Sequence, residues 1–241
     1  MQFAPVFHAE WLKIRTVRSL PGALLALFAA TTAFSAIAGT GGTSDPDLDP
    51  LFTALSGVTL GQIAALASAP WPCRRSITTA PCGSRWPRSR GADAGFAAKA
   101  TAIAVPVLVV SLPTALAALL VARAGLGPAA SGLTPAEQIR GVVGCAVHLT
   151  LMSLFAAGLA TLLRSAVATL SVLIPFLLVV SFVIGDAAGT VVEFMPDRAG
   201  QVVLYETHDG TLGPWSGLMV TALWTAAALG AGAWSLRRRD A

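Results

Sequence analysis

The sequence predicts an all-α membrane protein with six transmembrane helices, and three observations carry this prediction. The chain of 241 residues is 55% hydrophobic and only 12% charged, with a mean hydropathy of +0.72, whereas soluble domains are about a quarter charged. Its charged residues are confined to short stretches between long apolar runs. An amphipathic soluble helix would instead carry polar or charged residues along one whole face. Six of the apolar runs are long enough for a helix to cross a bilayer, which takes about 20 residues.

The six spans are expected at about 20–38, 52–70, 98–122, 142–163, 166–185 and 215–236. The fourth and fifth form one apolar run that is too long for a single crossing. Arg164 and Ser165 are its only polar interruption near the middle, so we expect a tight cytoplasmic hairpin there. The whole chain, 1–241, is interpreted as one transmembrane domain.

The distribution of basic residues predicts that both termini are cytoplasmic. With the N-terminus inside, 13 of the 16 basic residues fall on the cytoplasmic side, as the positive-inside rule requires. These residues are Lys13, Arg15, Arg18, Arg74, Arg75, Arg85, Arg88, Arg90, Lys99, Arg164, Arg237, Arg238 and Arg239. Nine of the twelve acidic residues then fall outside, although acids carry little topogenic weight. They are Asp45, Asp47, Asp49, Glu137, Asp186, Glu193, Asp197, Glu206 and Asp209.

The segment before the first span is predicted to form an interfacial helix. Its apolar residues recur at helical spacing, with basic residues between them, which suits a helix lying among the lipid headgroups. The apolar residues are Phe3, Phe7, Trp11 and Ile14, and the residues between them include His8, Lys13 and Arg15. A frayed tail is the alternative. A secretory signal is a further alternative, because the run ends in an A-x-A pattern at Ala36 and Ala38.

The first outside loop, DPDLDP, resembles the opening of a calcium-binding loop through Asp45, Asp47 and Asp49. A calcium loop needs glycine at its sixth position and glutamate at its twelfth, whereas this chain has Pro50 and Ser56 there. We therefore expect a solvated acidic loop and no metal site.

His148 is the one histidine inside a predicted span. Haem ligation usually needs a second axial partner, which no other span supplies, so a packed or hydrogen-bonded histidine is expected. Gly57 and Gly61 form a GxxxG pattern that allows close helix packing, but in a chain with 23 glycines the pattern arises easily by chance.

The three cysteines, Cys73, Cys82 and Cys145, form no CxxC pair and indicate neither a disulfide framework nor a metal site.

No motif for catalysis or for ATP binding is present. The chain lacks GxSxG, HExxH and the phosphate loop GxxxxGK[ST], so we expect no catalytic, cofactor-binding or metal-binding residues, and no substrate-binding residue can be assigned. Basic residues flank apolar segments and form no face for nucleic acid, so anionic lipid is the expected counter-charge. Gradient-driven carriers commonly place ionisable residues within their spans, which here are nearly free of acids. Energy is therefore expected from a partner.

Several local strings together resemble actinobacterial permeases of the type-2 ATP-binding-cassette transporter family. In chain order they are AEWLKIRTVRS, LSGVTLGQIAALA, AAKA, ATLLRS, LGPWSGL and RRRDA. The resemblance implies a multi-pass protein of the bacterial plasma membrane that dimerises with a second permease copy or paralogue. It also implies pairing with a separate ATPase subunit that binds the ATP, and an outside segment at 191–203 that dips toward the membrane.

Residues 68–96 depart from the family pattern. Such permeases usually continue after the second span with a motif resembling EYxxGxxR, in the cytoplasmic region that couples to the ATPase, whereas this chain reads SAPWPCRRSITTAPCGSRWPRSRGADAGF. We hypothesise that two compensating frameshifts bracket the stretch. One allowed codon choice, read from two bases into Ser68, gives GALAVSSEYHNGALRVSLAAVPRRGRRV, which restores the pattern. A diverged basic loop is the alternative.

The predicted function is that of a membrane-spanning permease subunit of an ATP-driven exporter for a hydrophobic or amphipathic compound. The alternatives are a non-transporting immunity or regulatory subunit, and a gradient-driven carrier. A path lined by Ala, Leu, Val and Gly carries no readable code for the substrate.

Overall fold

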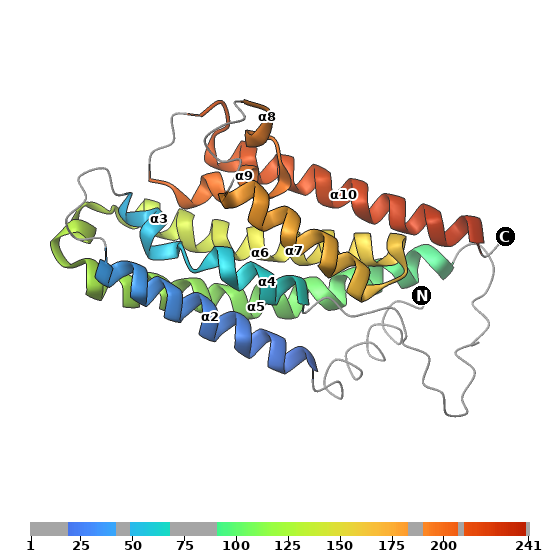
Figure 1. Ribbon diagram of the computed structural model, residues 1–241, viewed down its shortest axis with the longest axis horizontal. Coiled ribbons are helices and arrows are strands. Elements are labelled where there is room, and N and C mark those ends of the chain that lie inside the picture. Colours follow the sequence, from blue (N-terminus) through green and yellow to red (C-terminus); the bar gives the residue numbers. More distant parts are fainter. Residues whose placement is uncertain (1–18, 42–48, 68–90, 183–189, 207–209, 240–241) are drawn as a thin grey trace.

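The computed structural model describes residues 19–41, 49–67, 91–182, 190–206 and 210–239, and every secondary-structure element in these ranges is a helix. The long helices run up and down alternately to form an elongated bundle (Figure 1). They are α2 (Ser19–Gly41), α3 (Pro50–Leu55) continued by α4 (Val58–Ala67), α5 (Gly91–Leu126), α6 (Pro135–Leu163), α7 (Ala166–Phe182) and α10 (Pro214–Arg239). The short ones are η1 (Gly127–Gly132), α8 (Thr190–Glu193), α9 (Pro196–Gln201) and η2 (Val202–Leu204).

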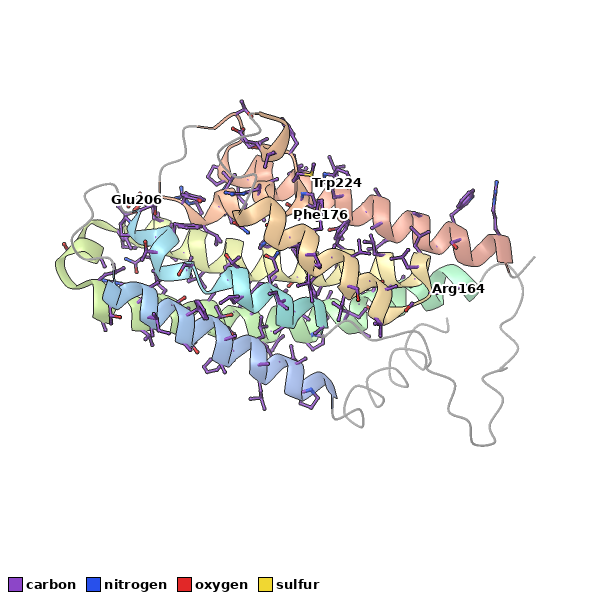
Figure 2. The ribbon with its side chains drawn as sticks, in the orientation of Figure 1. Arg164, Phe176, Glu206 and Trp224 are labelled. Carbon is purple, nitrogen blue, oxygen red and sulfur yellow. The ribbon has the colours of Figure 1, made fainter. Side chains whose placement is uncertain are left out.

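The two ends of the bundle differ, and each is named here after one residue. The Asp49 end holds the end of α2, the start of α3, η1 and Glu206, whereas the Arg164 end holds the turn between α6 and α7 and the end of α10 (Figures 1 and 2).

Five helical segments are long and apolar enough to cross a membrane: 21–41, 50–67, 100–126, 135–163 and 214–235. The remaining long helix, α7, is apolar but has only 17 residues, and residues 183–189, which follow it, lie outside the described part. The apolar helices support a membrane protein. A sixth span and the side of the membrane on which the termini lie stay predictions.

The third and fourth helices begin earlier than hydropathy indicates. α5 starts at Gly91 instead of 98 and ends at Leu126 instead of 122, which makes it 36 residues long. α6 starts at Pro135 instead of 142, because Thr134 and Glu137 form a capping box in front of its apolar part. Helices continue beyond their apolar residues because backbone hydrogen bonds do not require apolar side chains, so hydropathy marks the membrane-facing part and not the helix ends.

The second predicted span is broken where it meets α2. Ser56 and Gly57 separate α3 from α4, and the backbone N–H of Gly57 donates to the Ser35 hydroxyl at 3.3 Å. A Cβ on Gly57 would overlap the carbonyl oxygen of Thr31, and one on Gly61 would overlap the Thr31 hydroxyl. The GxxxG pattern, discounted in the sequence as a chance event, therefore marks the close approach of α2 and α4.

The predicted turn at Arg164 and Ser165 is present. Arg164 ends α6 in the left-handed conformation with a φ of 56°, a common way for a helix to stop. The Ser165 hydroxyl then accepts from the backbone N–H of Ala168 at 3.2 Å, which caps the start of α7. These two residues reverse the chain without a longer loop.

The first span is packed into the bundle along its length. α2 is a continuous helix through the A-x-A pattern at Ala36 and Ala38 and packs against α4 and α5. Leu27, Thr31 and Ser35 are fully buried. This packing favours a retained span over a cleaved signal. The predicted interfacial helix at 3–14 lies outside the described residues.

α6 is the central helix, in contact with α4, α5, α7 and α10. It joins two apolar clusters. The cluster toward the Asp49 end includes Leu55, Leu149 and Val203, and the cluster toward the Arg164 end includes Leu66 and Phe155. His148 lies between Cys145 and Leu149, which both belong to the cluster toward the Asp49 end, so a polar side chain enters the core within that cluster.

α10 carries three tryptophans that match the dimensions of a bilayer. Trp215 and Trp234 are both more than half exposed and are separated by 19 positions, or about 28 Å along a helix, close to the hydrocarbon thickness of about 30 Å. Such aromatic residues favour the two membrane interfaces. The Arg238 guanidinium lies 4.0 Å from the Trp234 ring centroid. Between them, Trp224 donates its indole N–H to the Phe194 carbonyl oxygen at 3.0 Å, as a group in lipid must do.

Gly57→Ala should destabilise the protein by about 3 kcal/mol, the upper end of the usual cost of overpacking, because the new methyl group overlaps the backbone of α2. Gly230→Ala is the matched control, since Gly230 lies in α10 with open space around its Cα and alanine favours a helix. Thermal unfolding in detergent measures both. Equal melting temperatures would show that the close approach of α2 and α4 is not needed.

Single-tryptophan variants should report different depths in the bilayer. Lipids brominated near the bilayer centre are expected to quench Trp224 more strongly than Trp215 or Trp234, and lipids brominated near the headgroups should show the opposite order. The three residues lie on one helix, so each serves as the control for the others. Equal quenching of all three by both lipids would contradict the placement of α10 across the membrane.

Candidate functional site

A buried cluster of polar side chains lies among the apolar residues of the cluster toward the Asp49 end. Its members come from α4, α6, α9 and α10, and each is fully or almost fully buried. We call it the polar cluster, and it consists of Gln62, His148, Asp197, Gln201 and Thr221. Burying such groups is costly unless they are hydrogen-bonded, so their gathering at one place is an organised feature of the fold.

The segment that brings Asp197 into the bundle is the one that joins the last two long helices. α9 packs against α6, α7 and α10, η2 packs against α6 and α10, and α8 contacts α9 (Figure 1). Residues 196, 197 and 199–204 are all buried. The sequence analysis assigned Asp197 to an outside loop, whereas its side chain has no exposed surface. The physical reason is that Pro196 starts a short helix whose polar face finds partners on α4.

The Asp197 carboxylate is held by two amide groups. Its Oδ1 accepts from the Gln62 Nε2 at 2.7 Å and from the Gln201 Nε2 at 2.9 Å. Gln201 lies one turn further along the chain, whereas Gln62 belongs to α4. A buried carboxylate is stable only when such donors replace its hydration, so these two amides make the position of Asp197 possible.

Gln62 also joins Asp197 to His148. The Gln62 Oε1 lies 3.2 Å from the His148 Nε2. Because the amide nitrogen of Gln62 faces the carboxylate, its oxygen faces the imidazole, and His148 must carry a hydrogen on Nε2. The prediction that His148 is packed and hydrogen-bonded is therefore confirmed.

The other nitrogen of His148 faces a glycine. Nδ1 is buried and has no hydrogen-bond partner among the described residues. A Cβ on Gly200 would overlap this nitrogen and would come within 2.9 Å of the Thr221 hydroxyl. Only glycine therefore lets α9 approach His148 this closely.

α10 holds the start of α9. The Thr221 hydroxyl lies 2.9 Å from the Pro196 carbonyl oxygen, and the Trp224 indole N–H reaches Phe194 in the same stretch. Figure 2 shows Trp224 about midway along the bundle, between Glu206 and Arg164 at the opposite ends.

A second set of contacts fixes the chain after η2 at the Asp49 end. Arg140 Nη2 donates to the carbonyl oxygens of Tyr205 at 2.8 Å and Glu206 at 3.1 Å. The Asp49 Oδ2 accepts from the Glu206 backbone N–H at 2.8 Å, and the Phe52 and Tyr205 rings stack with centroids 4.3 Å apart. Residues 194–206 are thus attached to α3, α4, α6 and α10.

The carboxyl of Glu206 has a raised pKa. Its partial burial is the main cause, and the nearby carboxyls of Glu137 and Asp49 raise the pKa further, while Arg140 opposes them. The folded state therefore favours the protonated form of Glu206 more than the unfolded state does, so this contribution to stability is lost as pH rises through the folded pKa. Burial likewise raises the pKa of the Tyr205 phenol.

The acidic loop of the sequence analysis is present only in part in the described residues. Asp49 caps α3 through a 2.9 Å hydrogen bond from the Phe52 N–H, while Asp45 and Asp47 lie outside the described part. No group of three or more His, Cys, Asp or Glu side chains in the described ranges is placed so that it could hold a metal ion. Cys145 is buried and unpaired, and Cys73 and Cys82 also lie outside.

Sequence reasoning missed the polar cluster apart from His148. Gln62 was a detectable signal, since a glutamine inside an apolar span needs an internal partner. Asp197 and Gln201, four positions apart after Pro196, have the spacing of one helix face. Nothing in the spacing shows that this face meets α4, because the contact joins residues 135 positions apart.

The chain matches no protein-family model, no curated protein and no solved structure.

Asp197→Ala should lower stability by about 1–3 kcal/mol for each buried amide left without an acceptor. Asp197→Asn keeps an oxygen at the same place and should cost less. Ser153→Ala is a control for burial alone, because the Ser153 hydroxyl bonds only within its own helix. Thermal unfolding in detergent ranks the three variants, and an Asp197→Ala protein as stable as Ser153→Ala would rule out an anchoring role for the carboxylate.

Proposed function

We propose that the chain is the membrane-spanning permease subunit of an ATP-driven exporter in the bacterial plasma membrane, with the ATP bound by a separate subunit. The observation that carries this proposal is the segment between the last two long helices. The family resemblance implies that this segment dips toward the membrane, and its residues 196–204 are packed against α6 and α10. A bundle of apolar helices with such a segment at one end fits a transport path that opens and closes at that end.

The charge distribution supports an Asp49 end that faces outward. Among the described basic residues, Arg164 and Arg237–Arg239 lie at the Arg164 end, and the positive-inside rule would put that end in the cytoplasm. At the opposite end, Arg123 donates to Gln138 at 2.8 Å and Arg140 binds backbone carbonyls. These two arginines serve to hold the fold, which accounts for their presence on the outer side.

The expected coupling region is the loop between the second and third spans. Residues 68–90 of this loop lie outside the described part, so the frameshift hypothesis stays a prediction. The helix that follows it begins at Gly91, whereas its apolar part begins at Ala100. The first turns of α5 thus extend beyond the apolar part, and they would carry movements of the coupling loop into the third span as a rigid rod.

Alternating access is the mechanism that this architecture supports. Closure of two ATPase subunits would move the Arg164 ends of the helices, and the polar cluster joins α4, α6 and α10 to α9. A movement of any of these three helices would therefore act on the segment 194–206, which runs from the middle of the bundle to the Asp49 end. The exported compound is expected to be hydrophobic or amphipathic, and a second permease copy or paralogue would complete the path.

A gradient-driven carrier is the second candidate because of one specific observation. The near absence of acids in the predicted spans argued against it, yet Asp197 is buried inside the bundle beside His148. Ionisable residues at such positions are frequent in gradient-driven transporters. Transport that an uncoupler abolishes and vanadate does not would favour this candidate.

The chain should co-purify with a protein that contains a GxxxxGK[ST] phosphate loop and hydrolyses ATP in a vanadate-sensitive way. The experiment compares three tagged chains from bacterial membranes in mild detergent: the sequence as it stands, the sequence with the restored reading of 68–96, and a Gly/Ser linker in place of 68–90. We expect the restored chain to retain the ATPase at least as well as the first, and the linker chain to lose it. Failure of both of the first two to retain an ATPase would contradict the proposal.

A further inference from the structure

His148 and Asp197 are two ionisable side chains that lie close together in the middle of the bundle. Both are fully buried, and Gln62 connects them by hydrogen bonds of 3.2 Å and 2.7 Å. Apolar side chains of similar volume would fill the same space at lower cost, so packing alone does not explain ionisable groups at this place. Ionisable groups inside a membrane protein commonly take part in proton binding.

The hydrogen bonds determine the protonation state that fits the closed arrangement. The Asp197 carboxylate orients the Gln62 amide, and the amide oxygen then requires a hydrogen on His148 Nε2. A neutral imidazole therefore has a bare Nδ1, and this nitrogen lies directly against Gly200. A buried Nδ1 without a hydrogen is an acceptor that receives no hydrogen bond, and the free-energy cost of this is modest.

Protonation of Nδ1 changes this balance. The imidazolium would place a charged N–H against Gly200 without any acceptor among the described residues. A buried charged donor without an acceptor is far more costly than a buried neutral nitrogen. The cost is relieved if α9 moves away and water reaches Nδ1. We propose that Gln62, His148 and Asp197 form a proton-binding site, and that uptake of one proton by His148 releases the segment 194–206 from the bundle.

Few other charges face this site. α4 and α7 contain no ionisable residue, and those of α10 are confined to Arg237–Arg239 at the Arg164 end. α6 carries Glu137 and Arg140 at the Asp49 end. On the segment itself, Arg198 adjoins Asp197, Glu193 of α8 accepts from Thr211, and Tyr205 and Glu206 follow η2. The Asp197 charge attracts a proton on His148 and so opposes release of the segment, but the cost of burying the imidazolium is the larger of the two effects.

Glu206 provides an internal control, because protonation of its carboxyl and protonation of His148 have opposite effects on the attachment of residues 194–206. Its raised pKa means that acidification neutralises a carboxyl beside Glu137 and Asp49 and strengthens the attachment of the segment. Protonation of His148 weakens the same attachment. The direction of the response to acid therefore identifies the group that controls it.

The site acts in the same way whichever energy source drives transport, so it goes beyond the proposed function. If the Asp49 end faces outward, protons from the outside medium would release the segment, which runs from the middle of the bundle to this end. The ligand is a proton and not a metal ion, since the described residues bring together no three His, Cys, Asp or Glu side chains that could hold a metal and both amide nitrogens face the carboxylate.

Cysteine accessibility in proteoliposomes without nucleotide and without an ATPase tests the inference. The chain carries Cys73→Ala, Cys82→Ala, Cys145→Ala and a single reporter, Val203→Cys, at a fully buried position of η2. A membrane-impermeant maleimide labels it between about pH 8 and about pH 5, the range in which histidine takes up a proton. The rate is divided by that of a matched chain with Gly210→Cys, an exposed position, which removes the intrinsic pH dependence of the thiol.

We expect the ratio of labelling rates to rise about tenfold for each pH unit of acidification over the titration range, as linkage to one proton requires. His148→Gln should abolish the rise, while Glu206→Gln and Asp197→Asn should retain it. A ratio that is flat or falls on acidification in the chain with His148 intact would overturn the proposal. A rise that survives in His148→Gln would also overturn the proposal. If the His148→Gln protein does not fold, His148→Asn takes its place. Loss of the ATPase partner has no effect on this readout, so the proposed function and this inference fail separately.

Discussion

The hydrogen bond between Gln62 and Asp197 is the interaction on which the arrangement of the bundle depends. A carboxylate without hydration must find donors in the protein, and here one of the two amide donors comes from a different helix. Apolar contacts are non-directional, so they would permit several positions of α9 along the bundle. A directional hydrogen bond of 2.7 Å between two buried groups permits only one position of α9. The polar cluster therefore sets the position of the segment, while apolar contacts supply most of its attachment.

Most other hydroxyl groups in the bundle do not connect helices. Those of Thr114 and Thr150 bond to carbonyl oxygens one turn back in their own helices, which satisfies them locally and leaves neighbouring helices free to slide. Thr221 and Thr225 of α10 are exceptions, since each also reaches a carbonyl oxygen of another element. Polar contacts between elements occur where α10 and α4 meet α6 and α9, and also between Gly57 and α2, between α5 and α6, and at the Asp49 end.

Hydropathy alone predicted where apolar helices run, because the cost of exposing backbone groups to lipid leaves few other structures. It did not predict the break at Gly57, which depends on the Thr31 carbonyl of another helix, or the early start of α6, whose signal was the capping box at Thr134. For the site, a hydrogen-bonded His148 followed from the lack of a second ligand. The burial of Asp197 did not follow, since it results from contacts between residues far apart in the chain.

The strength of the attachment suits a segment that moves. The hydrogen bonds that hold residues 194–206 to the rest of the molecule are few, and each contributes about 0.5–1.5 kcal/mol net, so the polar contacts together amount to a few kcal/mol. A ligand shifts a two-state equilibrium only by the difference of its affinities for the two states. One proton contributes about 1.4 kcal/mol per pH unit between the pKa values of the two states. A segment fixed by apolar contacts alone would not respond to a proton, whereas one positioned by a buried carboxylate and its two amides responds to a change of charge at that place.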